Sequence, residues 1–553
     1  MASVIFIWIY MIFTCYVIGF AGLKAIAGRQ DYRFKRESGF LFAGITAATV
    51  YAQFFSIFYK VGLWANLLLL VLCAFCFFRY KKELTDHLRT LLLTITPVKA
   101  GVTVLLFLIF AYGTSTGIIH YDTGLYHAQS IRWIEEYGIV PGLGNLHSRL
   151  AYNSASFCLS ALYSFAFLGG QSYHCCAGFL AFLLAVTCME GFSRERIRKP
   201  LLSDFVRAVA IYYLLIIFDE MVSPASDYFM VLSVFYVIIR WLDLMEKGEK
   251  SHLPYALLCV LGVFVVTVKL SGALILLLTI KPAVMLMKGK KGKETVKFLG
   301  IGFLTALPFF IRNVILSGWL VYPFTFVDLF DFDFKIPKGM ADYDAREIQV
   351  WGRGFSDVGR FDEPITEWLP DWAMGLDSVN KVFLLLALSS LVMLAGLCLY
   401  AIKDRKKDML DFLLVAGCVA MCFLFWLISA PLIRYGCVFL WVLPVLVWGF
   451  FYLKISPGLD RYKIYLIVIA LAGSYKAGAF VAETAKTAAV DYLIKQKDYE
   501  NFETVSYELH GYTFYYPKEG DRTGYMDFPA SPVKAEDIFR GESIEEGFKD
   551  VVH

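Results

Sequence analysis

The sequence predicts an all-α polytopic membrane protein, in which a bundle of about fourteen spanning helices carries a small folded α+β cap at its C-terminus. Of its 553 residues, 58% are hydrophobic and only 18% are charged, and the mean hydropathy is +0.60. An ordinary globular protein is far less apolar. Long apolar segments recur along the chain, and clusters of Lys and Arg follow only some of them. Composition therefore predicts the class, and the spacing of the clusters predicts the topology.

Each long apolar segment is predicted to cross the membrane as a helix, because about 20 helical residues span the hydrocarbon core. The predicted spans are 3–22, 40–59, 61–79, 100–119, 172–190, 205–218, 226–242, 253–268, 270–287, 297–316, 381–402, 410–428, 435–453 and 462–481. A further apolar run at 155–168 is too short to cross comfortably. It predicts a re-entrant or interfacial helix.

Clusters of basic residues orient the predicted helices. They follow the first, fifth, ninth and eleventh spans, which places all of them on one side of the membrane. The clusters contain Lys24, Arg29, Arg33, Lys35 and Arg36; Arg194, Arg196, Arg198 and Lys199; Lys288, Lys290, Lys291 and Lys293; and Lys403, Arg405, Lys406 and Lys407. Short loops rich in Lys and Arg stay in the cytoplasm. Both termini and the long loops at 120–171 and 317–380 are therefore predicted outside, and the net charge of +4 needs no nucleic-acid partner.

Two domains are predicted, a membrane domain at 1–484 and an outer cap at 485–553. In the cap, apolar side chains alternate on both sides of His510 and Gly511, which is typical of a β-hairpin. The chain has 12 cysteines. Most of them lie in predicted spans, so neither a disulfide framework nor a zinc site is predicted.

The stretch at 120–154 begins where the fourth predicted span ends, and it is unusually polar. Apolar residues recur from 124 to 137 at helical spacing, and Tyr126 and Trp133 lie on a neighbouring face. This pattern predicts an amphipathic helix in the membrane interface. Asp122 directly precedes it and has two interpretations: an N-cap that accepts a hydrogen bond from a first-turn N–H, and a catalytic carboxylate. Both can hold at once, because N-terminal N–H groups also keep a carboxylate ionised.

Further ionisable residues stand at the outer ends of predicted spans. They are Asp219, Glu220, Asp227, Lys269, Arg312 and Arg434. A single charge at such a place is often a structural ion pair or a snorkelling side chain. The gathering of all of them on one face predicts instead a site for an anionic ligand.

These features resemble the GT-C superfamily of membrane glycosyltransferases, which use polyprenyl-phosphate-linked sugars. The resemblance lies in an acidic residue that follows a spanning helix and opens the first large outer loop. The blocks YDTGLYHAQSIRWIEEYGIVPGLGNLHSRLAYNS, SPASD, RNVILSGWLVYPF and APLIRYG also resemble a large, poorly characterised bacterial membrane-protein family that is thought to belong there. The resemblance implies a GT-C-like bundle in the bacterial inner membrane with an extracytoplasmic active site.

The resemblance also implies roles for individual residues. Asp122 would be the general base that takes the proton of the acceptor hydroxyl. Guanidinium binds phosphate oxygens through two N–H groups, so Arg434 is the first candidate for the donor phosphate. The other phosphate candidates are Lys269, Arg312 and Arg149. The candidates for substrate binding are Tyr126, His127, Asn145, Asn153, Asp227 and Tyr322. The implied partners are a polyprenyl-phosphate-linked sugar and a glycan, lipid or protein acceptor.

No metal or other cofactor is predicted. Many members of the family carry two adjacent acidic residues, whereas Thr123 follows Asp122 here. Asp122 and His127, five residues apart, make a poor metal pair by themselves.

Two alternatives remain open. An O-antigen polymerase or ligase also handles lipid-linked glycans with outer arginines, but it needs no acidic base at the start of the first outer loop. A transporter or flippase also has many spans and buried charges, but alternating access calls for polar groups near the middle of the bilayer.

The predicted topology can be tested with tags at both ends and with single cysteines in the loop at 403–408. We expect extracytoplasmic probes to reach both tags in intact cells, and to reach the cysteines only after permeabilisation, because Lys and Arg hold that loop inside. A tag that is found in the cytoplasm would contradict this topology.

Overall fold

The computed structural model spans residues 1–553 and describes all of them except 29–31, 33, 35, 192–199, 406–408, 456–473, 475–477, 479–481, 483–489, 537 and 551–553. The predicted span at 462–481 falls almost wholly outside the described residues.

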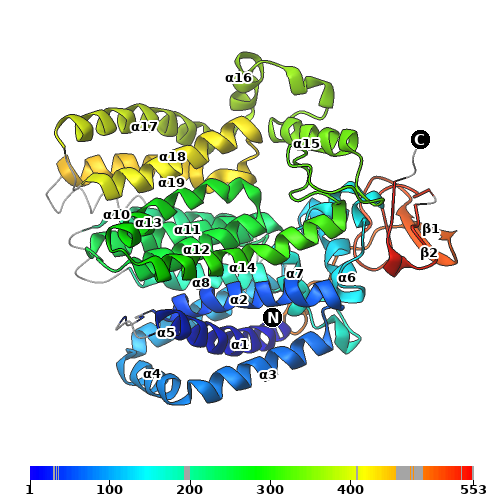
Figure 1. Cartoon of the computed structure of the whole chain (residues 1–553), viewed down its shortest axis with the longest axis horizontal. Coiled ribbons are helices and arrows are strands. Elements are labelled where there is room, and N and C mark those ends of the chain that lie inside the picture. The colour runs from blue at the N-terminus through cyan, green and yellow to red at the C-terminus, as the bar shows by residue number, and fades with distance from the viewer. Residues whose placement is uncertain are drawn as a thin grey trace.

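The described chain is mostly helical, with one small sheet near its C-terminus (Figure 1). The helices are α1 (Ala2–Ala27), α2 (Glu37–Phe58), α3 (Leu63–Arg79), α4 (Lys81–Thr94), α5 (Pro97–Ser115), α6 (Ala128–Glu136), α7 (Ala155–Leu162), α8 (Cys176–Met189), α10 (Leu202–Ile216), α11 (Ser226–Glu246), α12 (His252–Val268), α13 (Ile280–Lys288), α14 (Gly292–Ser317), α15 (Lys338–Gly352), α16 (Ile365–Gly375), α17 (Ser378–Lys403), α18 (Leu410–Ser429) and α19 (Ile433–Ile455). The strands are β1 (Thr504–Leu509) and β2 (Tyr512–Pro517).

Within the described residues, nine helices are long and apolar enough to cross a membrane, or ten if the bent pair α3 and α4 forms one span. This confirms a multi-pass membrane protein, although helix length supports fewer spans than the fourteen predicted. The predicted spans 172–190, 205–218 and 253–268 correspond to α8, α10 and α12, which are shorter than the other candidates. Most side chains of these three helices are buried in the bundle.

Close packing of α1 on α2 depends on two glycines. A β-carbon at Gly44 would stand 1.8 Å from the carbonyl oxygen of Cys15, and one at Gly19 would stand 1.9 Å from that of Phe40. Helices in membranes approach closely where small residues meet, because lipid supplies no hydrophobic force between them. Gly19 and Gly44 therefore fix the crossing point of the first helix pair.

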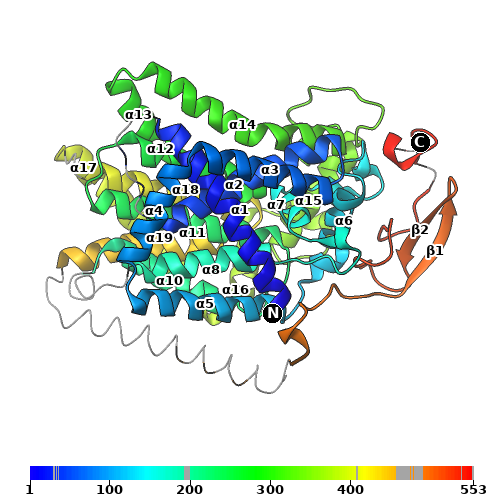
Figure 2. The same cartoon turned by 90° about the horizontal axis from the view of Figure 1, so that it is seen from below.

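Basic residues gather at one end of the bundle, as the sequence predicts. Arg36, at the start of α2, pairs with Glu190, which follows α8. Lys297 of α14 donates a hydrogen bond to the carbonyl of Ile26 at the end of α1 (3.0 Å). Other described members of the predicted clusters lie between α13 and α14 and at the end of α17. We call this end the basic end; the opposite end carries α6, α15 and the sheet (Figures 1 and 2).

The sheet is the predicted hairpin. Thr504 pairs with Pro517 and Leu509 with Tyr512 in antiparallel register. His510 and Gly511 connect the strands, both with positive φ (50° and 77°). A two-residue turn of this kind matches the twist of the two strands.

The cap, residues 490–550, docks on α6 and on the N-terminus. Gln129 Nε2 donates to the carbonyls of Gly524 and Asp527 (3.0 and 2.9 Å). The backbone N–H of Ser3 donates to the carbonyl of Ile494 (3.0 Å). Trp133 is buried against Phe528 and Phe548 of the cap. The helix predicted at 124–137 is present as a π turn at Thr123–His127 followed directly by α6, and its Trp133 is buried against the cap.

The docking surface contains a buried carboxyl, that of Glu135. It accepts hydrogen bonds from the hydroxyls of Ser172 (2.8 Å) and Tyr525 (2.6 Å). Burial nevertheless raises the pKa of Glu135 to about 7. The folded protein therefore binds more protons than the unfolded chain between the unfolded pKa of 4.5 and pH 7. Its stability falls as the pH rises through this window.

We expect Glu135→Gln to remove much of this pH dependence and to stabilise the docked cap at pH 8 by on the order of 1–3 kcal/mol, because a neutral amide does not lose a proton. The measurement is thermal unfolding in detergent from pH 5 to 8, with hydrogen exchange of residues 500–530. Glu136→Gln, at the exposed neighbouring position, is the control and should leave the slope unchanged. An unaltered slope in Glu135→Gln would assign the pH dependence to another group.

Candidate functional site

An ion pair between Asp122 and Arg434 forms the centre of the candidate site. Arg434 Nη2 donates to Asp122 Oδ2 at 2.6 Å, across 312 residues of chain. Both side chains are mostly buried but reach solvent, with 17% of the Asp122 and 26% of the Arg434 side chain exposed. Charged hydrogen bonds of this length are stronger than neutral ones, particularly away from bulk water.

The backbone around Asp122 is not that of a helix cap. Residues Thr123–His127 form a π-helical turn that runs directly into α6, and the Asp122 carboxylate accepts no hydrogen bond from its N–H groups. The N-cap interpretation is therefore wrong, and the carboxylate points to Arg434 instead. A single π turn spaces side chains differently from an α-helix and is frequent at functional sites.

Arg434 is placed by an irregular start to α19. The chain leaves α18 at Ser429, and Gly436 interrupts the next helix with φ −161°. A β-carbon at Gly436 would stand 2.4 Å from the indole ring of Trp426. The missing side chain at 436 thus lets the first turn of α19 pack on α18, with Arg434 directed at Asp122.

A second ion pair, between Lys269 and Asp227, adjoins the first. Asp227 lies in the first turn of α11, and Lys269 lies in extended backbone after α12. Lys269 Nζ contacts Asp227 Oδ1 and stands 3.6 Å from the ring centre of Tyr435. Arg434 Nε is 3.7 Å from Asp227 Oδ2. Two cations and two carboxylates therefore alternate in one cluster, and we call these four residues the ion cluster.

Two histidines flank the cluster. The Arg434 Nη1 group contacts the ring of His120, and His127 Nδ1 lies 3.2 Å from the hydroxyl of Thr123. Burial lowers the pKa of His127 to about 3. Burial also lowers the pKa of His120, and the nearby charge of Arg434 lowers it further. Both rings are neutral at pH 7.

The carboxyl of Asp122 is ionised for a different reason. Burial alone would raise its pKa, but the charge of the Arg434 guanidinium, together with its hydrogen bond to the carboxylate, outweighs burial and lowers the pKa to about 2. A carboxylate paired in this way is a weak base until its cation moves.

A cavity of about 270 Å³ opens beside the ion cluster. Lys269 and Tyr435 form its polar edge, and the rings of Tyr126, Tyr152 and Tyr322 line it. The rest of the lining is mainly apolar and includes Val266, Val268, Leu270, Phe309, Phe324, Ile348 and Phe425. The cavity is thus charged at one edge and hydrophobic beyond it, a combination that suits an amphiphile.

The long loop at 317–380 covers this cavity. Its helix α15 contributes Ala345, Ile348 and Gln349 to the lining. The close approach of α15 to the α18–α19 junction depends on Gly352, where a β-carbon would stand 2.7 Å from Ala430 Cα. The loop therefore closes over the site, which explains its length.

The structure places Arg312 and Asn153 in a buried clamp. Arg312 Nε donates to Asn153 Oδ1 (3.1 Å), and Nη1 contacts Ser56 and the carbonyl of Gly138. Asn153 Nδ2 donates in turn to the carbonyl of Phe309 (2.9 Å). Arg312 thus joins α2, α14 and the end of the α6 segment, outside the ion cluster, while Asn153 also lines the cavity.

Arg149 and Asn145 lie on the loop between α6 and α7. Arg149 is 3.5 Å from Glu347 of α15 and 4.5 Å from the ring centre of Trp351. Asn145 Nδ2 donates to the carbonyl of Phe334 (2.8 Å). Neither residue contacts the ion cluster; both hold the 317–380 loop.

Three residues of the site were not among the sequence candidates. They are His120, Tyr435 and Tyr152. His120 and Tyr435 stand beside or near predicted residues in the blocks HYD and IRYG. This closeness in sequence was the only indication that they belong to the site. Tyr152 packs between Tyr126 and Tyr322 at ring-centre distances of 5.7 and 6.0 Å, a contact that the sequence pattern does not indicate.

Metal ligands do not converge in this part of the chain. Across the residues that the structure describes, no three His, Cys, Asp or Glu side chains are arranged to hold a metal ion.

Comparison with known proteins gives one match. No curated protein and no solved structure matches the chain. A family model described as "Domain of unknown function (DUF8201)" matches residues 1–441. The match contains Asp122, Asp227, Lys269 and Arg434, and ends within α19. Because it covers most of the sequence, the chain belongs to the DUF8201 family.

Proposed function

We propose that this protein is an integral membrane glycosyltransferase that moves a sugar from a polyprenyl-phosphate donor to an extracytoplasmic acceptor. The observation that carries the proposal is the Asp122–Arg434 ion pair, which Asp227 connects to Lys269 at the edge of a mainly apolar cavity. Such a donor is an isoprenoid chain, a phosphate and a sugar, and the site offers apolar walls, two cations and a carboxylate.

The phosphate of the donor would lie between Arg434 and Lys269. Arg434 offers a planar fork of N–H groups, and Lys269 offers a compact ammonium. The two cations belong to one cluster, since both contact Asp227. Negative charge grows on the leaving phosphate oxygen as the glycosidic bond breaks, so cations already in place stabilise the transition state.

The lipid chain and the sugar would occupy opposite sides of this phosphate. Phe309, Phe425 and Leu270 supply apolar walls at membrane-facing helices. Tyr126, Tyr152 and Tyr322 line the same cavity, and aromatic rings of this kind can pack on the faces of a sugar. Tyr126 directly adjoins His127, with ring centres 4.4 Å apart.

The proposed reaction is a displacement at the anomeric carbon. The acceptor hydroxyl oxygen forms a bond to that carbon, while the bond from the carbon to the phosphate oxygen breaks and its electron pair stays on the phosphate. The hydroxyl proton passes to the carboxylate of Asp122. The products are the glycosylated acceptor and polyprenyl phosphate.

The low pKa of Asp122 is consistent with this role only if Arg434 moves. A carboxylate with a pKa of about 2 takes a proton poorly. A phosphate dianion or diester would compete for the Arg434 guanidinium and draw it from Asp122. The carboxylate would stay buried with less cation beside it, and its pKa would rise. Donor binding would in this way activate the base.

The proposal includes a location. The basic end of the bundle would face the cytoplasm by the positive-inside rule, and the ion cluster and cap would face outward in a bacterial inner membrane. The acceptor would then be a surface glycan, a lipid or a protein.

We expect Arg434→Ala to weaken binding of decaprenyl phosphate by at least about tenfold, since a hydrogen bond to a charged group contributes about 1.5–3 kcal/mol. Arg434→Lys should recover part of the affinity, because it keeps the charge without the fork. The measurement is titration of the purified protein in detergent. Arg360→Ala removes another outer arginine, one that pairs with Glu363, and should bind as wild type. Equal affinity in wild type and Arg434→Ala would exclude Arg434 as a phosphate ligand.

We expect Asp122→Asn to lower sugar transfer by about a hundred- to ten-thousand-fold, because an amide cannot take the proton of the acceptor. Donor binding and folding should persist, since the amide keeps the shape. The measurement is consumption of lipid-linked sugar from an envelope lipid extract, followed by mass spectrometry.

Asp377→Asn is the matched control for this experiment. Asp377 is a genuine N-cap, accepting from the N–H groups of Val379 and Asn380 at the start of α17, and its variant should keep nearly full activity. Transfer by Asp122→Asn within a few-fold of wild type would show that Asp122 is not the base.

A further inference from the structure

A second cavity, of about 370 Å³, lies in the half of the bundle nearer the basic end. Helices α1, α2, α11, α12 and α14 form its walls, together with Tyr32 and Phe34 before α2. It shares no lining residue with the cavity beside the ion cluster. Its volume falls within the range of ligand-binding pockets, and the proposed glycosyl transfer gives it no role.

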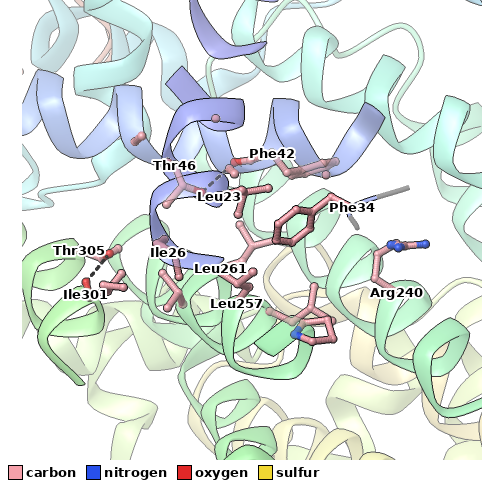
Figure 3. A pocket seen from close by; sticks show the side chains of 18 of the residues that line it. Leu23, Ile26, Phe34, Phe42, Thr46, Arg240, Leu257, Leu261, Ile301 and Thr305 are labelled. Atoms are coloured by element: carbon pink, nitrogen blue, oxygen red, sulfur yellow. Dashed lines mark hydrogen bonds between the residues drawn. The ribbon is translucent and has the colours of Figure 1, made fainter. Parts of the chain in front are cut away.

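Away from its two arginines, the walls of this cavity are mainly hydrocarbon. Leu23, Leu257 and Leu261 stand around its centre (Figure 3). Thr46 and Thr305 also line it, but their hydroxyls donate to the carbonyls of Phe42 and Ile301 in their own helices, each at 2.9 Å. A ligand in this space would therefore make mainly apolar contacts.

Two arginines give the cavity a charged edge. Arg36 and Arg240 line it, and the lining contains no Asp or Glu. Figure 3 shows Arg240 at one side of the cavity and Thr305 at the other. Lipid-facing helices rarely carry arginine unless it is paired or functional, so the partners of these two residues decide what they can still bind.

Three arginines share the carboxylate of Asp243 beside this edge. Asp243, whose side chain is fully buried, contacts Arg207 at 2.6 Å, Arg240 at 2.8 Å and Arg36 at 3.3 Å. Arg36 also pairs with Glu190. In the described contacts Arg240 uses only Nη1 for this pairing, although a guanidinium carries five N–H donors. Arg240 therefore keeps donors for an anion at the edge of the cavity.

The dimensions match one leaflet of a membrane. The cavity runs along α2 from Arg36 to Val50, a distance of about 20 Å at 1.5 Å per helical residue. Half of the hydrocarbon core is about 15 Å thick. Its charged edge is at the basic end, and its apolar part reaches toward the middle of the helices.

We propose that this cavity binds one acyl chain of an anionic phospholipid from the leaflet at the basic end, with the lipid phosphate held by Arg36 and Arg240. Basic pockets between spanning helices recognise anionic headgroups by this combination of charge and hydrocarbon. A soluble phosphate would leave the apolar walls uncovered, and an uncharged apolar molecule would leave the arginine donors unused. The proposal does not depend on the glycosyltransferase function.

The test is native mass spectrometry of the full chain in detergent, titrated with phosphatidylglycerol and with phosphatidylcholine of the same acyl chains. We expect phosphatidylglycerol to be retained about tenfold better, because two arginines attract its net charge. Equal retention of the two lipids would overturn the proposal.

Substitutions that fill the cavity locate the binding. Gly22 lines the cavity, and a β-carbon there meets no atom within 4 Å, so Gly22→Leu should occupy the lipid's space and abolish the preference. Leucine also favours a helix more than glycine does, which protects the fold. Gly300→Leu is the matched control, at an α14 glycine that is equally unobstructed and lies outside the lining; it should bind as wild type.

Two more variants keep the result decisive. Leu257→Trp fills the cavity from the α12 wall and should also abolish the preference. It replaces Gly22→Leu as the test if that variant does not fold. Arg240→Ala should reduce the retention of phosphatidylglycerol more than that of phosphatidylcholine, because the choline cation already offsets the phosphate charge of the second lipid. Undiminished phosphatidylglycerol binding in both cavity-filling variants would place the lipid elsewhere and refute the assignment.

Discussion

The pairing of Asp122 with Arg434 is the constraint around which the cap end of the bundle is organised. Both groups are largely removed from water, and a charge in such a place is costly without a partner. Their contact joins the loop after α5 to the start of α19, 312 residues apart. Asp227 and Lys269 extend the pair into a cluster, so that four separate chain segments must meet for every charge to be satisfied.

The parts that surround this cluster have a common effect, which is to enclose it. The 317–380 loop closes over the cavity through α15, and the cap packs on α6 just beyond the π turn that follows Asp122. Enclosure lowers the local dielectric constant and strengthens each charged contact inside. In the proposed function, it would also keep water from competing with the acceptor for the sugar.

The two ends of the bundle use ionic groups differently. At the basic end, three arginines converge on the fully buried side chain of Asp243, and two of them line the cavity there. At the cap end, cations and carboxylates alternate, and Lys269 of this cluster lines the cavity beside it. The first arrangement suits binding of an anion, whereas the second places a carboxylate beside cations, as the proposed sugar transfer requires.

The sequence by itself determined the membrane class, most helix positions, the hairpin at His510 and Gly511, and the gathering of basic residues at one end. These properties depend on local hydrophobicity, periodicity and charge, which can be read residue by residue. It also placed Asp122, Asp227, Lys269 and Arg434 near one face. Only the tertiary structure decided that Asp122 bonds Arg434 rather than capping a helix, that Trp133 faces the cap, and that Arg312 sits in a clamp. Such contacts depend on how helices far apart in sequence pack, and close approaches such as those at Gly44 and Gly436 set that packing without leaving a local pattern.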